Sequence, residues 1–289
     1  MIRQLWPGLK KYNNKSRDIF MRRDGWNIPG RRLAGYFITI GMLLVGQLLN
    51  NTAWAAQPLH IAVAANFATP ARQVAQDFER QFSIPAVVTV ASSGTLFVQI
   101  THGAPFDVFM SADARRPEQL VDEHHADRDT LHVYAQGRLA YLNADIVAPD
   151  MNDLVNTVIA GKRKLAIANP ALAPYGLAAR QVLTRLHKWP RAERHLVLGK
   201  NILQTYQYYR SGNVEHALVA ASLVKPGQPH AALVPAHLHQ PILQKVVVPA
   251  SAPQPEQAQL FVNYLMSAQV QQQLSQWGYD SYILDKESP

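Results

Sequence analysis

The chain has 289 residues, of which 48% are hydrophobic and 17% are charged, a composition typical of a folded protein. It contains no cysteine, which excludes disulfides, thiolate metal ligands, a cysteine nucleophile and a lipid anchor on cysteine. The net charge of +8 suggests a nucleic-acid partner, but residues 1–56 contain nine of the 28 basic residues and two of the 20 acidic ones. The rest is nearly neutral, so we expect no nucleic-acid partner.

The N-terminal segment 1–55 has the pattern of a secretory signal peptide. A basic part precedes an apolar run over Tyr36–Leu49, and Ala53-Trp54-Ala55 fits a small-residue cleavage site. The apolar run is short for a transmembrane helix. Because the basic part is long, Met21 is an alternative start. We expect cleavage near Ala55 and export of the rest of the chain, with an uncleaved anchor as the alternative.

From Leu59 onward, strand-like segments alternate with helical ones. The expected strands are Leu59–Asn66, 86–91, Phe106–Asp113, His132–Leu142, Lys164–Pro170, 196–201 and 217–224. The expected helices are Pro70–Phe82, 95–103, 117–123, Tyr175–Leu186 and 202–212, with two more helical patterns in 255–279. Residues 225–241 are the most loop-like segment. The alternation predicts a largely parallel sheet with helices on both faces, which binds its ligand at the carboxyl ends of the strands.

Four loops share a feature that indicates an anion site. The stretches VAANF, ASSGT, NPALAPYGL and GKNILQT each follow an expected strand and open an expected helix. The start of a helix has unpaired N–H groups and the positive end of the helix dipole, so several starts around one cleft would bind an anion. Neutral donors suffice for this, and they avoid the cost of burying charged side chains.

Five motifs carry a resemblance to a known family. They are Ala64–Phe67 (AANF), Ser92–Leu96 (SSGTL), Gly103–Asp113 (GAPFDVFMSAD), Asn169–Leu183 (NPALAPYGLAARQVL) and Lys200–Ile202 (KNI). With these motifs in this order, residues 57–284 resemble the periplasmic molybdate-binding proteins, the substrate-binding components of ABC transporters for molybdate and tungstate. The resemblance is to the branch with Asn in the first loop and Tyr-Gly in the third.

The resemblance implies a type II periplasmic binding protein fold, in which two α/β lobes joined by two crossover segments enclose a ligand cleft. We expect lobe 1 to comprise 56–136 and 241–289, and lobe 2 to comprise 137–240. The segment His132–Leu142 is the expected crossing strand, and Gln244–Ala250 is the expected return. Closure about the hinge would present the bound anion to a permease in the inner membrane. We expect a monomer without cofactor or catalytic activity.

The same resemblance places the oxyanion among five residues, with a sixth as a weaker candidate. They are Ala65, Asn66, Ser93, Tyr175 and Ile202, and the weaker candidate is Ser92. Asn66 would donate through its side-chain amide and its backbone, and Ser93 through its hydroxyl and its N–H. Tyr175 and Ile202 would donate backbone N–H groups, with the Tyr175 phenol as a further donor.

Two positions depart from the family pattern. Relatives of the same branch tend to have a hydroxyl residue where this chain has Ala65, so one side-chain donor is absent. The other branch supplies a tyrosine where this chain has Ala220, which agrees with Tyr175 serving instead.

Three other functions remain open at this point. The ligand could be sulfate, thiosulfate or another tetrahedral oxyanion. A secreted hydrolase could use Ser92 or Ser93, although the chain has no G-x-S-x-G motif. A sensor or adhesion module with a similar cleft is the third alternative.

Two further groups of residues suggest other chemistry only weakly. The histidines at 124, 125, 230, 237 and 239 lack a carboxylate–histidine signature, so we expect no metal cation site. Asp107 has no histidine or second acid at motif distance, and we expect it to be structural.

Overall fold

The computed structural model describes residues 57–143, 150–225, 227–228 and 230–280. All of these belong to the unit Ala56–Pro289, which is separate from Met1–Ala55. The expected signal peptide, its cleavage site near Ala55 and the alternative start at Met21 lie outside the described residues. In the part that is described, no helix has the length and apolar character needed to cross a membrane.

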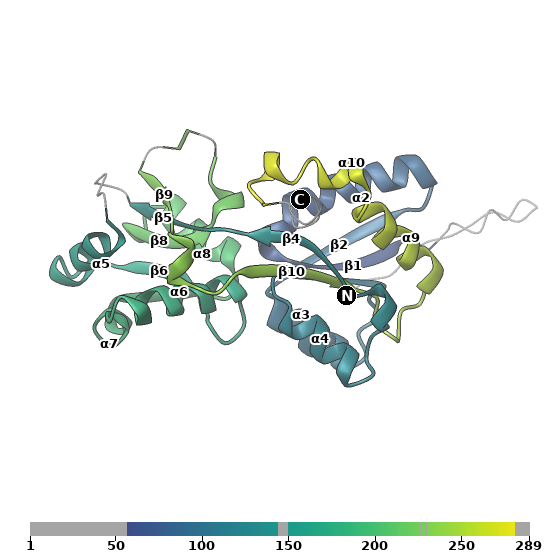
Figure 1. The fold of residues 1–289 in the computed structure, drawn as a ribbon, viewed down its shortest axis with the longest axis horizontal. Helices are drawn as coiled ribbons and strands as arrows, with labels where there is room; N and C mark the ends of the chain where they lie inside the picture. The colour runs from purple at the N-terminus through teal and green to yellow at the C-terminus, as the bar shows by residue number, and fades with distance from the viewer. Residues whose placement is uncertain (1–56, 144–149, 226, 229, 281–289) are drawn as a thin grey trace, which may run out of the picture. The chain divides into compact units, whose positions relative to one another are not determined.

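The first sheet has the strand order β2-β1-β3-β10-β4 (Figure 1). Its strands are β1 (Leu59–Ala64), β2 (Ala86–Ala91), β3 (Val108–Ser111), β4 (His132–Gly137) and β10 (Ile242–Val247). Strand β1 is parallel to β2 and β3, whereas β10 is antiparallel to β3 and β4. Its helices are α2 (Ala68–Phe82), α3 (Ser93–Thr101), α4 (Arg115–Asp122), α9 (Pro255–Leu265) and α10 (Ala268–Gln271).

The second sheet has the strand order β7-β6-β8-β5-β9. Its strands are β5 (Leu139–Asn143), β6 (Leu165–Ala168), β7 (Leu196–Gly199), β8 (His216–Ala220) and β9 (Ala231–Leu233). Strand β6 is parallel to β7 and β8, whereas β5 is antiparallel to β8 and β9. Its helices are α5 (Met151–Ala160), α6 (Pro174–Arg185), α7 (Trp189–Ala192) and α8 (Ile202–Arg210). Each sheet with its helices is called a lobe below.

The described residues also form short 3-10 turns, of which η1, η4 and η5 follow strands. They are η1 (Ala65–Phe67), η2 (Arg128–Thr130), η3 (Glu193–His195), η4 (Ala221–Leu223), η5 (Ala236–Leu238) and η6 (Ser275–Trp277).

Strand β1 shows why the sequence reads as a continuous apolar run. Ile61 and Val63 pack into the core beneath α2 and α9, and Ala62 packs on the opposite face beneath α3 and α4. Because both faces of the strand are covered, alternation with polar residues is lost.

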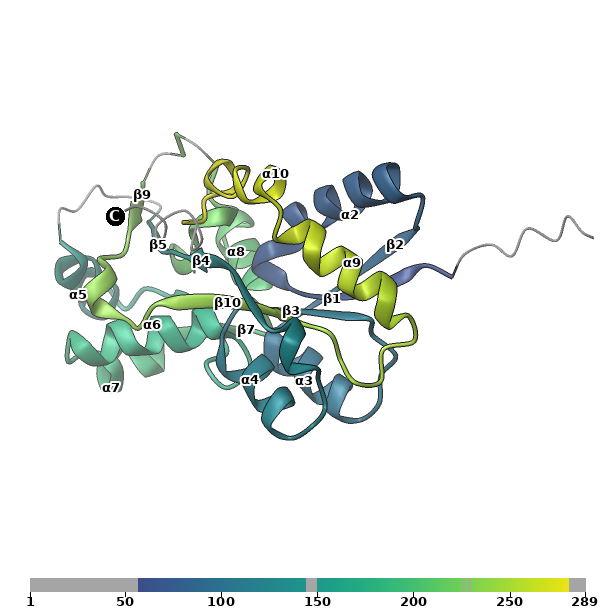
Figure 2. The ribbon, with the colours of Figure 1, turned by 45° about the vertical axis from the view of Figure 1, so that its right-hand side comes forward.

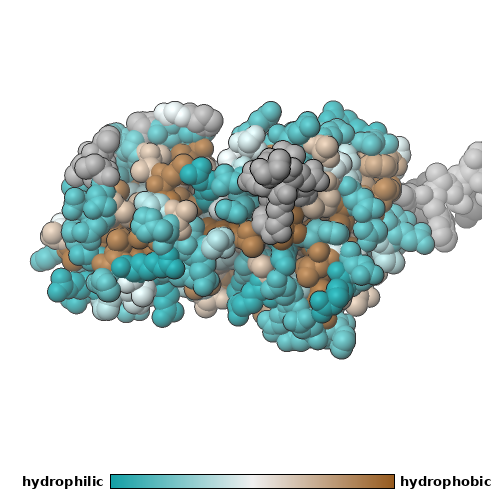
Figure 3. Space-filling view, in the orientation of Figure 1, coloured by the Kyte–Doolittle hydropathy of each residue, from teal (hydrophilic) through white to brown (hydrophobic). Residues whose placement is uncertain are grey.

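On the face drawn in Figure 3 the surface is mostly hydrophilic, with hydrophobic residues in small separate groups.

The chain crosses between the lobes at β4 and β5, which only Arg138 separates although they belong to different sheets. The crossing expected within His132–Leu142 is therefore confirmed. On the return, Ile242 pairs with Gly137, and both views show β10 beside β4 between the sheets (Figures 1 and 2). The segment expected as the return, Gln244–Ala250, begins inside β10, so the chain rejoins the first sheet earlier. The lobe limits 56–136 with 241–289 and 137–240 stay a prediction.

Three local expectations differ from the structure. Both sheets are mixed rather than largely parallel, because β10 and β5 run against their neighbours. The expected strands Leu59–Asn66 and 217–224 end early, at Ala64 and Ala220, and continue as 3-10 turns. Strand β9 lies in the segment 225–241, expected to be a loop. Apolar composition does not distinguish a buried strand from the apolar turn that follows it.

Asp107 is a fully buried carboxylate that connects three segments of the first lobe. Its Oδ2 accepts a hydrogen bond from the N–H of His60 at 2.7 Å, and its Oδ1 accepts one from the N–H of Gln254 at 2.8 Å. Its own N–H donates to the carbonyl of His60 at 2.8 Å. These contacts give Asp107 a structural role.

We expect Asp107→Ala to lower the free energy of unfolding by about 2–4 kcal/mol, because two backbone N–H groups lose their acceptor. Urea denaturation followed by circular dichroism measures the change. Asp129→Ala, at an exposed carboxylate, is the control and should shift stability by less than about 0.5 kcal/mol. Equal stability of the Asp107 variant and the unmodified chain would contradict the assignment.

Candidate functional site

The structure brings all six residues proposed from the sequence to one small cavity. Its volume is about 10 Å³, counted as the space open to the centre of a water molecule, and it lies where strands of both lobes end. The lining residues are Ala64, Ala65, Asn66, Ser92, Ser93, Ala112, Ala173, Pro174, Tyr175, Asn201 and Ile202. None of these lining residues has a formally charged side chain at neutral pH.

Three helices and one 3-10 turn begin at this cavity. Ser93 is the first residue of α3, Ile202 is the first of α8, and Tyr175 is the second of α6 after Pro174. Ala65 opens η1 in the same way. The N–H groups of a first turn have no partner within the helix, and the helix dipole is positive at this end. The cavity is therefore surrounded by backbone donors and suits an anion.

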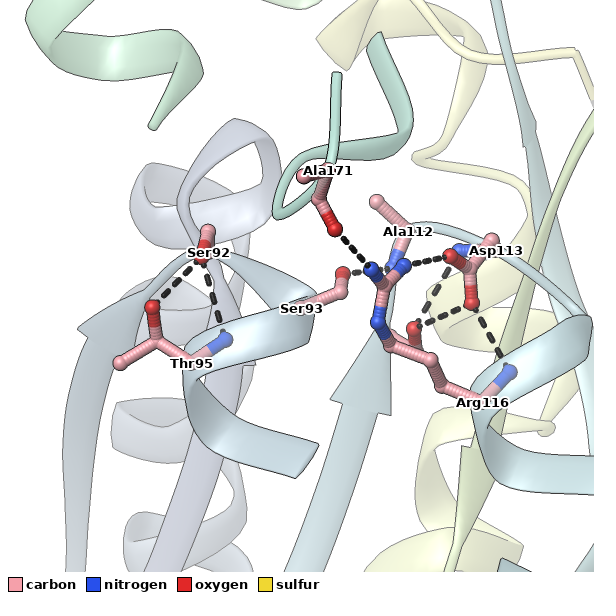
Figure 4. Close-up of polar contacts among 8 residues, drawn as sticks. Ser92, Ser93, Thr95, Ala112, Asp113, Arg116 and Ala171 are labelled. Atoms are coloured by element: carbon pink, nitrogen blue, oxygen red, sulfur yellow. Dashed lines mark hydrogen bonds and ion pairs between the residues drawn. The ribbon is translucent and has the colours of Figure 1, made fainter. Parts of the chain in front are cut away.

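The two serines of the second loop have different roles, as Figure 4 shows. The Oγ of Ser92 accepts from the N–H of Thr95 at 3.2 Å and lies 2.7 Å from Thr95 Oγ1, so Ser92 is the N-cap of α3. The Oγ of Ser93 accepts from the N–H of Ala112 at 2.9 Å. That bond uses a lone pair of Ser93, so its hydroxyl proton remains available for donation.

The Tyr-Gly step of the third loop has a steric reason. Pro174 occupies the first position of α6, where its missing N–H costs nothing. A Cβ on Gly176 would lie 2.1 Å from the carbonyl oxygen of Ala168, the last residue of β6. Only glycine permits this approach, which brings the start of α6, and with it Tyr175, to the end of the strand.

The side chains of Asn66 and Tyr175 form hydrogen bonds with neighbouring side chains. Asn66 Nδ2 donates to Gln244 Oε1 at 2.8 Å and to the hydroxyl of Tyr279 at 3.1 Å. The hydroxyl of Tyr175 accepts from Gln244 Nε2 at 3.4 Å. Both amide hydrogens of Asn66 are therefore used in the structure, whereas the Tyr175 hydroxyl accepts and keeps its own proton for donation. The expected donations to the anion from these two side chains stay predictions. The backbone N–H groups of both residues remain candidate donors.

The buried phenols near the site are uncharged. Burial raises the pKa of Tyr175 well above its usual value, and the neighbouring Tyr279 and Tyr134 raise it further. Burial, with a smaller contribution from Tyr279, also raises the pKa of Tyr134 well above its usual value. These phenols add no negative charge that would repel an anion.

Contacts between the lobes enclose the cavity on two sides. The N–H of Gly94 donates to the carbonyl of Leu172 at 2.9 Å, and Arg116 Nη2 donates to the carbonyl of Ala171 at 3.0 Å (Figure 4). On the other side, the Oγ of Ser222 donates to the carbonyl of Asn66 at 3.3 Å. The structure therefore shows the two lobes closed over the cavity.

The charged side chain at this contact between the lobes is neutralised by a partner within the first lobe. Arg116 is buried, and its guanidinium forms an ion pair with Asp113. Arg116 therefore contributes a hydrogen bond across the cavity without a net local charge.

The other candidate chemistries find little support in the described residues. Within them, no group of three or more His, Cys, Asp or Glu side chains is placed to hold a metal ion. The hydroxyls of Ser92 and Ser93 contact Thr95 and a backbone N–H, neither of which can act as the base of a hydrolase. Ala65 lines the cavity, whereas Ala220 lies fully buried at the end of β8 outside the lining.

Sequence reasoning missed several residues of the site. Asn201 lines the cavity and caps α8, accepting from the N–H of Gln204 at 2.9 Å, and an Asn before a helix is a recognisable signal for such a cap. Gln244 could have been noticed as a polar residue inside an apolar strand. Tyr279 and Ser222 have no local signal, because only the fold brings them to Asn66.

Comparison with known proteins identifies the family. A family model described as bacterial extracellular solute-binding protein matches residues 59–280. The molybdate-binding protein ModA of Rhodobacter capsulatus is 34% identical over 226 residues, which are 78% of this chain and 89% of that protein. ModA of Azotobacter vinelandii is 35% identical over 236 residues, 80% of this chain and 93% of that protein.

The fold gives the same result. The solved structure of the Azotobacter vinelandii periplasmic molybdate-binding protein matches with a TM-score of 0.70 at 31% identity, over 77% of this chain and 98% of that one. The type II periplasmic binding protein fold expected from the sequence is thus confirmed. The chain belongs to the bacterial extracellular solute-binding proteins, in one family with the molybdate-binding proteins of Rhodobacter capsulatus and Azotobacter vinelandii.

Proposed function

We propose that this chain binds molybdate, and also tungstate, in the cavity between its lobes and delivers the anion to an ABC transporter permease. The observation that carries the proposal is the convergence of the first turns of α3, α6, α8 and η1 on one cavity lined by uncharged residues. The names of the family members in Rhodobacter capsulatus and Azotobacter vinelandii support molybdate as the ligand.

The donor set favours a fully deprotonated oxyanion. The backbone N–H groups of Ala65, Asn66, Ser93, Tyr175 and Ile202 and the hydroxyl of Ser93 would donate to its oxygens. The side-chain oxygens of Ser92 and Asn201 already accept bonds as helix caps. An oxyanion that keeps a proton would therefore find no free acceptor for it, which disfavours species such as hydrogen phosphate.

The proposed role includes transport but no catalysis. Segment 1–55 would direct secretion and be cleaved near Ala55, giving a periplasmic monomer that works without a cofactor. Closure of the lobes around the anion would create the form that the permease recognises. The contacts of the Ser92 and Ser93 hydroxyls, which are Thr95 and a backbone N–H, include no base, and this supports a binding role over that of a serine hydrolase.

Isothermal titration calorimetry with molybdate, tungstate and sulfate tests the proposed ligand. We expect sub-micromolar binding of molybdate and tungstate and much weaker binding of sulfate. Sub-micromolar binding of sulfate without binding of molybdate would refute the ligand assignment, and binding of none of the three would refute the anion site itself.

The two serines provide a matched pair of variants. Ser93→Ala should weaken molybdate binding by at least about tenfold, because it removes a charge-assisted hydrogen bond of roughly 1.5–3 kcal/mol. Ser92→Ala removes the cap of α3, so it should lower the free energy of unfolding by about 1 kcal/mol and change affinity less. Calorimetry and urea denaturation of both variants measure these effects. A larger affinity loss in the Ser92 variant would reverse the assignment.

Gly94→Ala tests the contact between the lobes. A Cβ at this position would lie 2.8 Å from the carbonyl oxygen of Leu172 and 3.0 Å from Arg116 Nη2. Such overpacking costs about 1–3 kcal/mol, so we expect molybdate to bind about five- to a hundredfold more weakly, mainly through faster dissociation. Stopped-flow release of the anion measures the rate. Val98→Ala, at an exposed position of the same helix, is the control and should leave the rate unchanged.

A further inference from the structure

A fully buried glutamine behind the cavity makes hydrogen bonds to both lobes. Gln244 lies in β10 and is 0% exposed. Its Oε1 accepts from Asn66 Nδ2 at 2.8 Å and from the hydroxyl of Tyr134 at 3.0 Å. Its Nε2 donates to the hydroxyl of Tyr175 at 3.4 Å. Every polar atom of the amide is therefore used.

The partners of Gln244 include one candidate anion donor from each lobe. Asn66 is in η1 at the end of β1 of the first sheet, and Tyr175 is in the first turn of α6 in the second lobe. Gln244 is not among the residues that line the cavity, so its neutral amide would act on the anion through these neighbours and not by direct contact.

Gln244 also lies at the hinge. Strand β10 runs beside β4 between the sheets, as Figure 2 shows. A Cβ on Gly137, the last residue of β4, would lie 2.1 Å from the Tyr175 hydroxyl and 2.8 Å from Gln244 Nε2. The Tyr175 phenol therefore reaches the point where the chain crosses between the lobes.

The chemistry of this position requires an amide. Asn66 and Tyr134 both donate, so they need an acceptor, whereas the Tyr175 oxygen receives a proton from the other end of the same side chain. A carboxylate offers acceptors only, and an aliphatic side chain would remove an acceptor of the Asn66 amide, whereas the Tyr134 hydroxyl could still donate to the carbonyl of Ser111, 3.3 Å away.

We propose that Gln244 is a positioning residue for anion binding: by bonding Asn66 and Tyr175 together from behind, it aligns their backbone N–H groups on one anion. The inference rests on the proposed function, because it needs the cavity to bind an oxyanion. The bond to Tyr175 joins the lobes, so it belongs to the closed arrangement in which both loops face the ligand.

The first experiment compares two glutamines on neighbouring strands. Gln244→Leu should weaken molybdate binding by at least about tenfold in calorimetry, because the Asn66 and Tyr175 loops lose their shared partner. Gln136→Leu is the matched control, since Gln136 lies on β4 opposite Leu243 and is partly exposed. We expect its affinity to stay within about twofold of the unmodified chain. Equal affinity of the Gln244 variant and the unmodified chain would overturn the proposal.

The second experiment separates positioning from a general loss of stability. In Gln244→Glu at about pH 8, the carboxylate cannot donate to Tyr175 and places a negative charge behind the anion, so binding should be at least about tenfold weaker. Burial raises the pKa of that carboxyl, and its protonated form again offers one acceptor and one donor. At about pH 6 the affinity should therefore return toward that of the unmodified chain.

The affinity is expressed as the ratio to the unmodified chain at each pH, so that any titration of the anion itself cancels. A ratio that rises as the pH falls supports positioning. A ratio that is equally low at both pH values overturns it. If the unmodified chain binds no oxyanion at either pH, the proposed function fails instead, and the two failures are distinguished.

Discussion

The N–H groups at the start of a helix cannot be satisfied by the helix itself, and this constraint organises the site. Three helices from two lobes begin around one cavity, so their unpaired donors share a space that excludes most water. Neighbouring residues reduce the number of unpaired N–H groups at these helix starts. Ser92 and Asn201 cap their helices, and Pro174 has no N–H at all. The remaining donors are stabilised when an anion supplies the oxygens that they lack.

Local features, such as a loop that follows a strand and opens a helix, could be predicted from the sequence. The strand–loop–helix pattern predicted helix starts around one cleft, and the resemblance to the molybdate-binding proteins gave Ser93 and Ile202, both of which line the cavity. The directions of the Asn66 and Tyr175 side chains could not be predicted, because their partner Gln244 is 178 and 69 residues away. The reversed strands β5 and β10 were missed for a similar reason, since periodicity carries no information about strand direction.

The polar residues of the site form two layers, one that faces the cavity and one that supports it from behind. The layer facing the cavity offers backbone N–H groups and one hydroxyl, whereas the layer behind it consists of Gln244 and neutral phenols that contact one another. Phe67 packs against this second layer, because its ring lies edge-on against Tyr134 and Tyr279 at 5.0 and 5.1 Å between centroids. Charged groups are kept in pairs, as with Arg116 and Asp113.

The single residue between β4 and β5 limits how the lobes can move. Arg138 gives the chain only one residue in which to change sheets, and the returning strand is paired to β4 at Gly137 directly beside it. Two hydrogen-bonded strands that cross together resist twisting and sliding but can bend. The lobes should therefore open and close by a hinge rotation about these two paired strands. Each closure should return the helix starts to the same positions around the ligand.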